Sequence, residues 1–204
     1  TSIVLETVEK INNNNFPGVV AIKSTVSPGT TESLILKYPN LKLAFVPEFL
    51  RERCAVVDFI ENHDVCVIGT NSDKVYEDIK KTHGTYPKKF IMVSPTEAEM
   101  VKYYNNIYNA TLIVLANSFY EICKSIGADY TKVKNALVNR EHINDSYLQC
   151  NENFRGFGGV CLPKDTLAIA TLVKQKKIDV SFFETLITEN NKYKTTIYEG
   201  MRLQ

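Results

Sequence analysis

One cysteine of this chain stands where a nucleophile would be useful. Cys161 follows a glycine-rich stretch, and Lys164 and Asp165 come directly after it. The three glycines just before it are Gly156, Gly158 and Gly159. Glycines allow tight turns and close approach of the backbone to a ligand, and a thiol at a helix entry beside a lysine has the electropositive setting that favours a thiolate. On local chemistry alone, covalent catalysis and a buried structural cysteine are equally good interpretations.

A second polar pair precedes this segment in the sequence. Lys102 and Asn106 are four residues apart, so on a helix they share one face. The helix that carries them is predicted to begin at the capping box Ser94-Pro95-Thr96-Glu97 and to stop at Gly127. Its length, about 45 Å at 1.5 Å per residue, suits the spine of a helical domain or a dimer interface. The apolar positions that suggest this are Ile107, Leu112, Leu115, Phe119 and Ile122.

The elements before residue 94 alternate between strand and helix. Strands are expected at 19–22, 42–46, 65–69 and 89–93, and helices at 3–11, 32–37 and 73–81. This alternation predicts an α/β domain over residues 1–93 with a mostly parallel sheet, followed by an all-α domain over 94–204. Further helices are expected at 129–138, 164–174 and 182–201. Ligands of such sheets bind at the carboxyl ends of the strands, where the turns containing Thr25 and Glu48 lie.

The composition narrows the classes of protein. With 204 residues, 44% hydrophobic and 23% charged, the chain has the composition of a soluble globular protein. A net charge of +1 without a basic block argues against nucleic-acid and membrane partners. The five cysteines are far apart and odd in number, which favours reduced thiols and a cytoplasmic protein. The three histidines have no metal-site spacing, so no metal is expected.

Four motifs, in order, resemble those of one enzyme family. They are Ile22-Lys23-Ser24-Thr25-Val26 with Pro28-Gly29-Thr30, Pro47-Glu48-Phe49-Leu50-Arg51-Glu52, Ala98-Glu99 with Lys102 and Asn106, and Gly156-Phe157-Gly158-Gly159-Val160-Cys161-Leu162-Pro163-Lys164-Asp165. The chain therefore resembles the UDP-glucose/GDP-mannose dehydrogenases, which oxidise the C6 alcohol of a nucleotide sugar to the uronic acid with NAD. The resemblance implies two hydride transfers through a thiohemiacetal and a thioester on Cys161. It also implies a homodimer through the long helix from Pro95.

The resemblance implies roles for further residues, position by position. Lys102 and Asn106 would stabilise negative charge on the C6 oxygen, Asp165 would orient or activate water, and Glu48 would be the base of thioester hydrolysis. Thr25 would hold that water near the nicotinamide. The remaining expected contacts are Glu52 and Lys164 to the cofactor, and Phe49, Leu50, Phe157 and Gly158 to the sugar.

The sequence departs from the family pattern at several points. It contains no G-x-G-x-x-G phosphate finger, so we expect a fragment or truncated form of a longer enzyme that binds NAD poorly by itself. His142 stands where many UDP-glucose enzymes carry an arginine, and Arg53 replaces a usual glycine. UDP-glucose, GDP-mannose and an unusual nucleotide sugar all remain possible substrates. A second interpretation is non-enzymatic: an inactive dimerisation module related to such enzymes.

Overall fold

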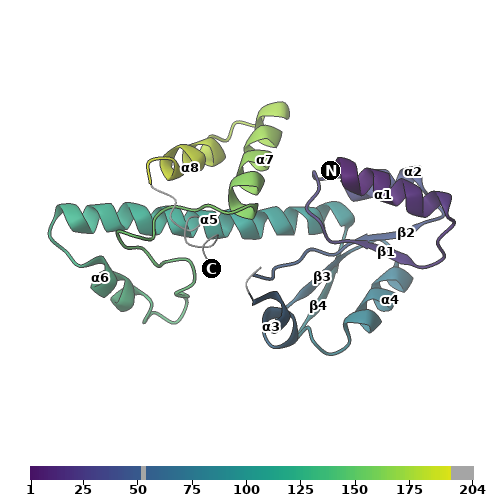
Figure 1. Cartoon of the computed structure of the whole chain (residues 1–204), viewed down its shortest axis with the longest axis horizontal. Coiled ribbons are helices and arrows are strands. Elements are labelled where there is room, and N and C mark those ends of the chain that lie inside the picture. The colour runs from purple at the N-terminus through teal and green to yellow at the C-terminus, as the bar shows by residue number, and fades with distance from the viewer. Residues whose placement is uncertain (52–53, 194–204) are drawn as a thin grey trace. The chain divides into compact units, whose positions relative to one another are not determined.

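The chain forms two compact units, Thr1–Lys102 and Tyr103–Gln204, and each is described separately. The computed structural model in Figure 1 describes residues 1–51 and 54–193. Within these residues no helix is both long and apolar enough to cross a membrane.

The first unit is built on a four-stranded sheet. Its strands are β1 (Val19–Ile22), β2 (Lys42–Phe45), β3 (Cys66–Gly69) and β4 (Phe90–Val93), in the order β1-β2-β3-β4. β1 pairs with β2 and β3 with β4 in parallel, while β2 meets β3 antiparallel, with Phe45 opposite Gly69. The α/β class is confirmed. The sheet was predicted to be mostly parallel, and two of its three pairings are parallel. The antiparallel pairing of β2 with β3 was not predicted, because residue patterns locate strands but do not give the direction in which neighbours pair.

Helices cover both faces of this sheet. The first unit contains α1 (Ser2–Asn13), α2 (Thr30–Lys37), α3 (Ala55–Ile60) and α4 (Asp73–His83). Alternate residues of β2 point to opposite faces: Leu43 and Phe45 pack in the cluster that includes α1 and α2 side chains, whereas Ala44 packs with side chains of α4. Figure 1 shows α1 and α2 on one side of the strands and α4 on the other.

The long helix α5 (Pro95–Ser125) begins at the predicted capping box. Ser94 N–H donates to Glu97 Oε2 at 2.7 Å, and Glu97 N–H donates to Ser94 Oγ at 3.3 Å. The first turns of α5 belong to the sheet unit, where a Cβ on Gly69 would lie 2.5 Å from the Cβ of Ala98. Glycine at the end of β3 thus allows α5 to start close against the sheet.

The second unit packs its other helices around the remainder of α5. They are α6 (Tyr130–Leu137), α7 (Cys161–Gln175) and α8 (Phe182–Asn190). Ile107 and Ile113 of α5 share a core with Phe157, Ile169 and Leu186, which joins α5 to α7 and α8. A separate cluster joins α5 to α6. In Figure 1, α7 and α8 lie together on one side of this part of α5.

Three element predictions need correction. The six-residue α3 was not predicted, because it is too short to show a helical period. Helix α7 begins at Cys161, three residues earlier than expected, since Pro163 falls in the first turn, where no backbone N–H is needed. Helix α8 ends at Asn190, well before Met201; residues 194–204 lie outside the part that the structure describes.

Candidate functional site

The predicted site residues fall into two groups, one in each unit. In the first unit, Thr25 and Glu48 follow the parallel strands β1 and β2, whose last residues, Ile22 and Phe45, are register partners. Each therefore lies three residues beyond its strand at the same edge of the sheet. Thr25, Glu48, Phe49 and Leu50 are all half-buried, which leaves part of each side chain accessible.

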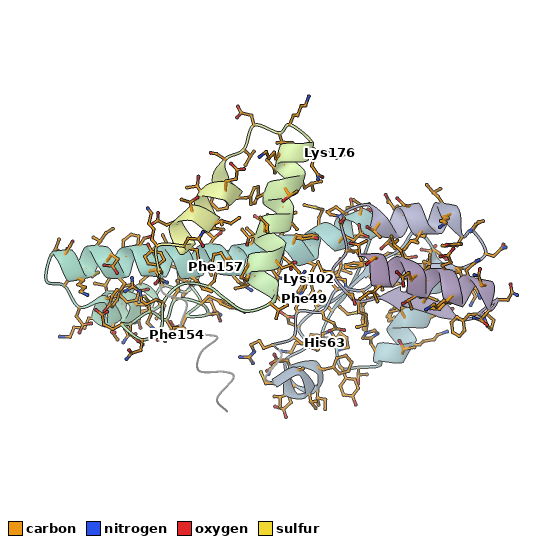
Figure 2. All side chains as sticks on the ribbon, turned by 45° about the horizontal axis from the view of Figure 1, so that its top comes forward. Phe49, His63, Lys102, Phe154, Phe157 and Lys176 are labelled. Carbon is orange, nitrogen blue, oxygen red and sulfur yellow. The ribbon has the colours of Figure 1, made fainter. Side chains whose placement is uncertain are left out.

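Lys102 joins the turn after β2 to α5. Its ammonium donates a hydrogen bond to the backbone carbonyl of Glu48 and lies 5.7 Å from the ring centroid of Phe49. Figure 2 shows Phe49 and Lys102 side by side. The Glu48 carboxylate itself pairs with Lys23. Of the predicted first-unit residues, the structure thus brings Lys102, Glu48 and Phe49 into direct contact.

A buried carboxylate that sequence reasoning missed fixes the end of the same turn. Asp58 of α3 accepts from Arg51 through Nε at 2.9 Å, Nη2 at 2.6 Å and the backbone N–H at 3.0 Å. The Arg51 side chain, followed by its backbone N–H, holds the pKa of Asp58 well below its usual range. Glu52, the predicted cofactor contact one residue further on, lies outside the described residues.

A second missed residue, Glu99, holds the turn after β1. Its carboxylate is fully buried and accepts from Gly29 N–H at 2.5 Å, Thr31 N–H at 2.8 Å and Thr31 Oγ at 2.6 Å. These donors form the N-terminal end of α2, so an acidic side chain of α5 caps α2. The resemblance includes Glu99 in its motif, but only the structure reveals what its carboxylate binds.

In the second unit, the predicted cysteine starts a helix and is exposed. Cys161 is the first residue of α7, and its thiol side chain is accessible to solvent. One helical turn later, Asp165 is fully buried. Asn106 Nδ2 donates to Asp165 Oδ2 at 2.6 Å, and the Lys164 ammonium pairs with the other carboxylate oxygen. The structure therefore joins Asn106 of α5 to Asp165 and Lys164 of α7, the helix that also carries Cys161.

The other cysteines of the chain are less exposed than Cys161. Burial raises the pKa of Cys66 to about 11 and that of Cys150 to about 11, so both remain neutral thiols near pH 7. Cys123 is buried too, and Cys54 is half-exposed. Cys161 is the exposed cysteine among the five.

The glycine turn before Cys161 is held by two asparagines that the sequence did not single out. Asn190 Oδ1 accepts from Phe157 N–H at 2.7 Å, and Asn190 Nδ2 donates to Phe157 C=O at 2.9 Å. Asn117 Oδ1 accepts from Gly156 N–H at 3.1 Å. The Phe157 ring is buried in the core, so this residue has a structural role, and its predicted contact with the sugar stays untested, as does that of Gly158. No sequence motif marks an asparagine within a helix as the partner in hydrogen bonds of this kind.

No group of three or more His, Cys, Asp or Glu side chains within residues 1–51 and 54–193 is arranged to hold a metal ion. The group around Cys161 consists of an exposed thiol and a buried carboxylate that accepts a hydrogen bond from Asn106 and pairs with Lys164.

Comparison with known proteins places both units in one family. Residues 96–192 match the central domain of the UDP-glucose/GDP-mannose dehydrogenase family, and residues 1–86 match the NAD-binding domain of that family. The two matches together span most of the chain.

Individual relatives agree with the family matches. The chain is 32% identical over 195 residues to a UDP-glucose 6-dehydrogenase of Rickettsia prowazekii, which covers 92% of this chain and 44% of that protein. It is 33% identical to a UDP-glucose 6-dehydrogenase of Bacillus subtilis, covering 90% and 40%. A solved UDP-glucose dehydrogenase of Pyrobaculum islandicum superposes with a TM-score of 0.80 at 30% identity, covering 91% and 44%. The chain thus spans less than half the length of these relatives.

Proposed function

We propose, from the premise that this chain belongs to the UDP-glucose/GDP-mannose dehydrogenase family, that it supplies the nucleophile of a nucleotide-sugar 6-dehydrogenase. The reaction is the NAD-dependent oxidation of a C6 alcohol to a uronic acid. UDP-glucose is the proposed sugar nucleotide, since the relatives named above are UDP-glucose dehydrogenases.

One observation carries this proposal: an exposed thiol at the start of α7, with a buried carboxylate one turn later that is bonded to Asn106 and Lys164. A fully buried carboxylate is costly unless it is paired. A scaffold helix has no need of this arrangement, whereas covalent catalysis needs a thiolate and donors held in fixed positions.

The chemistry proposed for this group is addition to an aldehyde. The Cys161 thiolate attacks the C6 carbonyl carbon, a C–S bond forms, and the carbonyl electron pair moves onto oxygen. Asn106 has two amide N–H groups, of which one is bonded to Asp165, so the other is proposed to donate to that oxygen. Asp165 keeps the Asn106 amide in orientation. Covalent capture prevents a reactive aldehyde from escaping.

Roles for the first-unit residues follow in the same way. Lys102 carries three N–H donors and is proposed to add positive charge at the sugar oxygen. Its bond to the Glu48 carbonyl fixes the backbone of that turn. The Glu48 carboxylate is proposed as the base that takes a proton from water in thioester hydrolysis, and the Thr25 hydroxyl as a second contact of that water.

NAD is the cofactor of the family domain that residues 1–86 match. A dinucleotide pyrophosphate binds at a helix N-terminus that follows a strand. The N-terminus of α2, which follows β1, is already filled by the Glu99 carboxylate. The start of α2 is therefore not open to a pyrophosphate, and the sequence contains no G-x-G-x-x-G turn, so we expect calorimetric titration of this chain to show no tight NAD binding.

A homodimer through α5 is part of the proposal. Leu115, Phe119 and Ile122 lie at helical spacing on α5 and are each about half exposed (47%, 49% and 52%), whereas Ile107 is in the core. Such an apolar stripe on a surface helix suits burial against a second copy.

Substrate protection of Cys161 tests the proposed function. Iodoacetamide labelling of each thiol is followed by peptide mass spectrometry, with UDP-glucose, GDP-mannose or buffer alone, and Cys54 is the internal reference. We expect UDP-glucose to slow labelling of Cys161 and to leave Cys54 unchanged. Equal rates of Cys161 labelling in all three mixtures would refute sugar binding by this chain.

The alternative function is that of an inactive dimerisation module. The observation that favours it is the exposed α5 stripe together with the filled α2 N-terminus. The same labelling experiment decides: a module predicts a dimer whose Cys161 labelling no sugar changes.

A further inference from the structure

The side-chain amide of Asn190 forms hydrogen bonds with both the backbone N–H and the backbone C=O of Phe157. Asn190 is 6% exposed. Its oxygen accepts from Phe157 N–H at 2.7 Å and its nitrogen donates to Phe157 C=O at 2.9 Å. Only a side chain that carries one acceptor and one donor in this geometry satisfies both backbone groups. The last residue of α8 is therefore bonded to a residue four positions before Cys161.

The two preceding residues are restrained as well. Asn117 Oδ1 accepts from Gly156 N–H at 3.1 Å and from Arg155 Nε at 2.8 Å. The Arg155 guanidinium lies 4.7 Å from the ring centroid of Tyr120 and 5.2 Å from that of Tyr193. Residues 155–157 are thus fixed in succession by side chains of α5 and of the segment that ends α8.

The restraint matters because the segment contains glycines, whose backbone is costly to order. Gly156 and Gly159 adopt φ values of 66° and 84°, and glycine loses more conformational entropy on ordering than other residues. The Phe157 ring is 2% exposed and anchored in the core (Figure 2). The bonds to the Phe157 backbone therefore restrain the segment that leads into α7, and Cys161 is the first residue of α7.

We propose that Asn190 is a positioning residue for the Cys161 nucleophile, acting through the Phe157 backbone. This inference rests on the proposed function, which makes Cys161 the nucleophile. The N–H groups of the first turn of α7 stabilise a thiolate only while Cys161 stays at the helix start, so α8 controls the reactivity of a residue on α7.

Asn190→Asp tests the proposal with little change of shape. The carboxylate keeps the acceptor for Phe157 N–H but places a negative oxygen against Phe157 C=O. When this carboxyl takes up a proton, it again offers one donor and one acceptor, so acid restores the clamp. The matched control is Asn191→Asp, the same change at the exposed neighbouring residue.

The measurement is the rate of iodoacetamide labelling of Cys161 relative to the wild-type chain, from about pH 8 to about pH 5.5. Cys54 is the internal reference, and labelling of the buried Cys123 and Cys150 reports unfolding. At about pH 8, we expect iodoacetamide to label Cys161 of N190D at least about threefold more slowly than Cys161 of the wild-type chain, because a displaced nucleophile loses its stabilising donors. The ratio to wild type should return toward one in acid, and N191D should stay at one throughout.

A Cys161 ratio of one at every pH, in an N190D chain that melts lower and recovers in acid, would overturn the proposal. Asn190 would then stabilise the fold without positioning the thiol. Asn190→Ser, which leaves room for water to bond the Phe157 backbone, replaces N190D if the buried thiols become labelled, and a ratio of one in that variant refutes the proposal equally. No sugar is present in this experiment, so its failure is distinct from a failure of substrate protection.

Discussion

Replacing Glu99 by glutamine should weaken the first unit by a predictable amount. The carboxylate accepts three hydrogen bonds from the start of α2. An amide keeps one oxygen but turns an N–H2 group toward an N–H donor. Hydrogen bonds to a charged group contribute about 1.5–3 kcal/mol, and an anion at a helix N-terminus contributes about 0.3–1 kcal/mol. The expected loss is therefore about 2–4 kcal/mol.

Thermal unfolding followed by circular dichroism measures this loss. For a chain of this size each kcal/mol lowers Tm by about 2–4 °C, so Glu99→Gln should melt about 4–16 °C below wild type. Hydrogen exchange should show loss of protection at the Gly29 and Thr31 amides, which Glu99 accepts from.

Glu97→Gln is the control, because it makes the same chemical change two residues earlier on α5. Glu97 is exposed and closes the capping box, a position where glutamine also works. Its Tm should stay close to wild type. If the two variants melt at the same temperature, or if Gly29 and Thr31 keep their protection in Glu99→Gln, the buried carboxylate does not stabilise α2 as argued.

Three further perturbations have defined outcomes. Burial lowers the pKa of His63, whose Nδ1 has no hydrogen-bond partner among the described residues. As the pH falls, His63 therefore takes up a proton in the unfolded chain before it does so in the folded chain, and the stability of the fold decreases below about pH 6.5. His63→Phe should lose less stability than wild type between neutral and mildly acidic pH, as measured by urea midpoints. Asp58 is the opposite case, since Arg51 lowers its pKa, so its stabilising effect is present above its usual value and is lost in acid. Asp58→Asn should be less stable than wild type at neutral pH, with the gap in urea midpoint closing as the pH is lowered below about 4. Phe119→Glu places a charge in the exposed stripe of α5 and should give a monomer by light scattering with an unchanged far-ultraviolet circular dichroism spectrum; a wild-type chain that is already monomeric at micromolar concentration would refute the dimer.

Much of the fold was readable from local signals. The capping box at Ser94 gave the start of α5 because both of its bonds are made by residues three apart. All four strands were predicted within one residue of their ends, since buried β-branched runs bounded by turns have few other solutions. Two features were missed for different reasons: the antiparallel pairing of β2 with β3 is decided by distant parts of the chain, and the six-residue α3 is too short to show a helical period.

The candidate site divides in the same way. The residues proposed to carry chemistry, such as Cys161 and Lys102, were identifiable by motif. The residues that hold them were not: Glu99 acts on a turn about seventy positions away, and Asn190 on one thirty-three positions away. Long-range bonds of this kind depend on how the elements pack, and no spacing in the sequence records them.

The three glycines before Cys161 are not equivalent, and this bears on which substitutions the segment can tolerate. Gly156 and Gly159 have positive φ, so any side chain there strains the backbone itself. Gly158 does not have positive φ, and the backbone alone would accept alanine at that position. Gly158 is half-buried, so the cost of a methyl group there is set by the space around the residue. Substitution at Gly158 therefore tests that space, whereas substitution at Gly156 or Gly159 also strains the backbone.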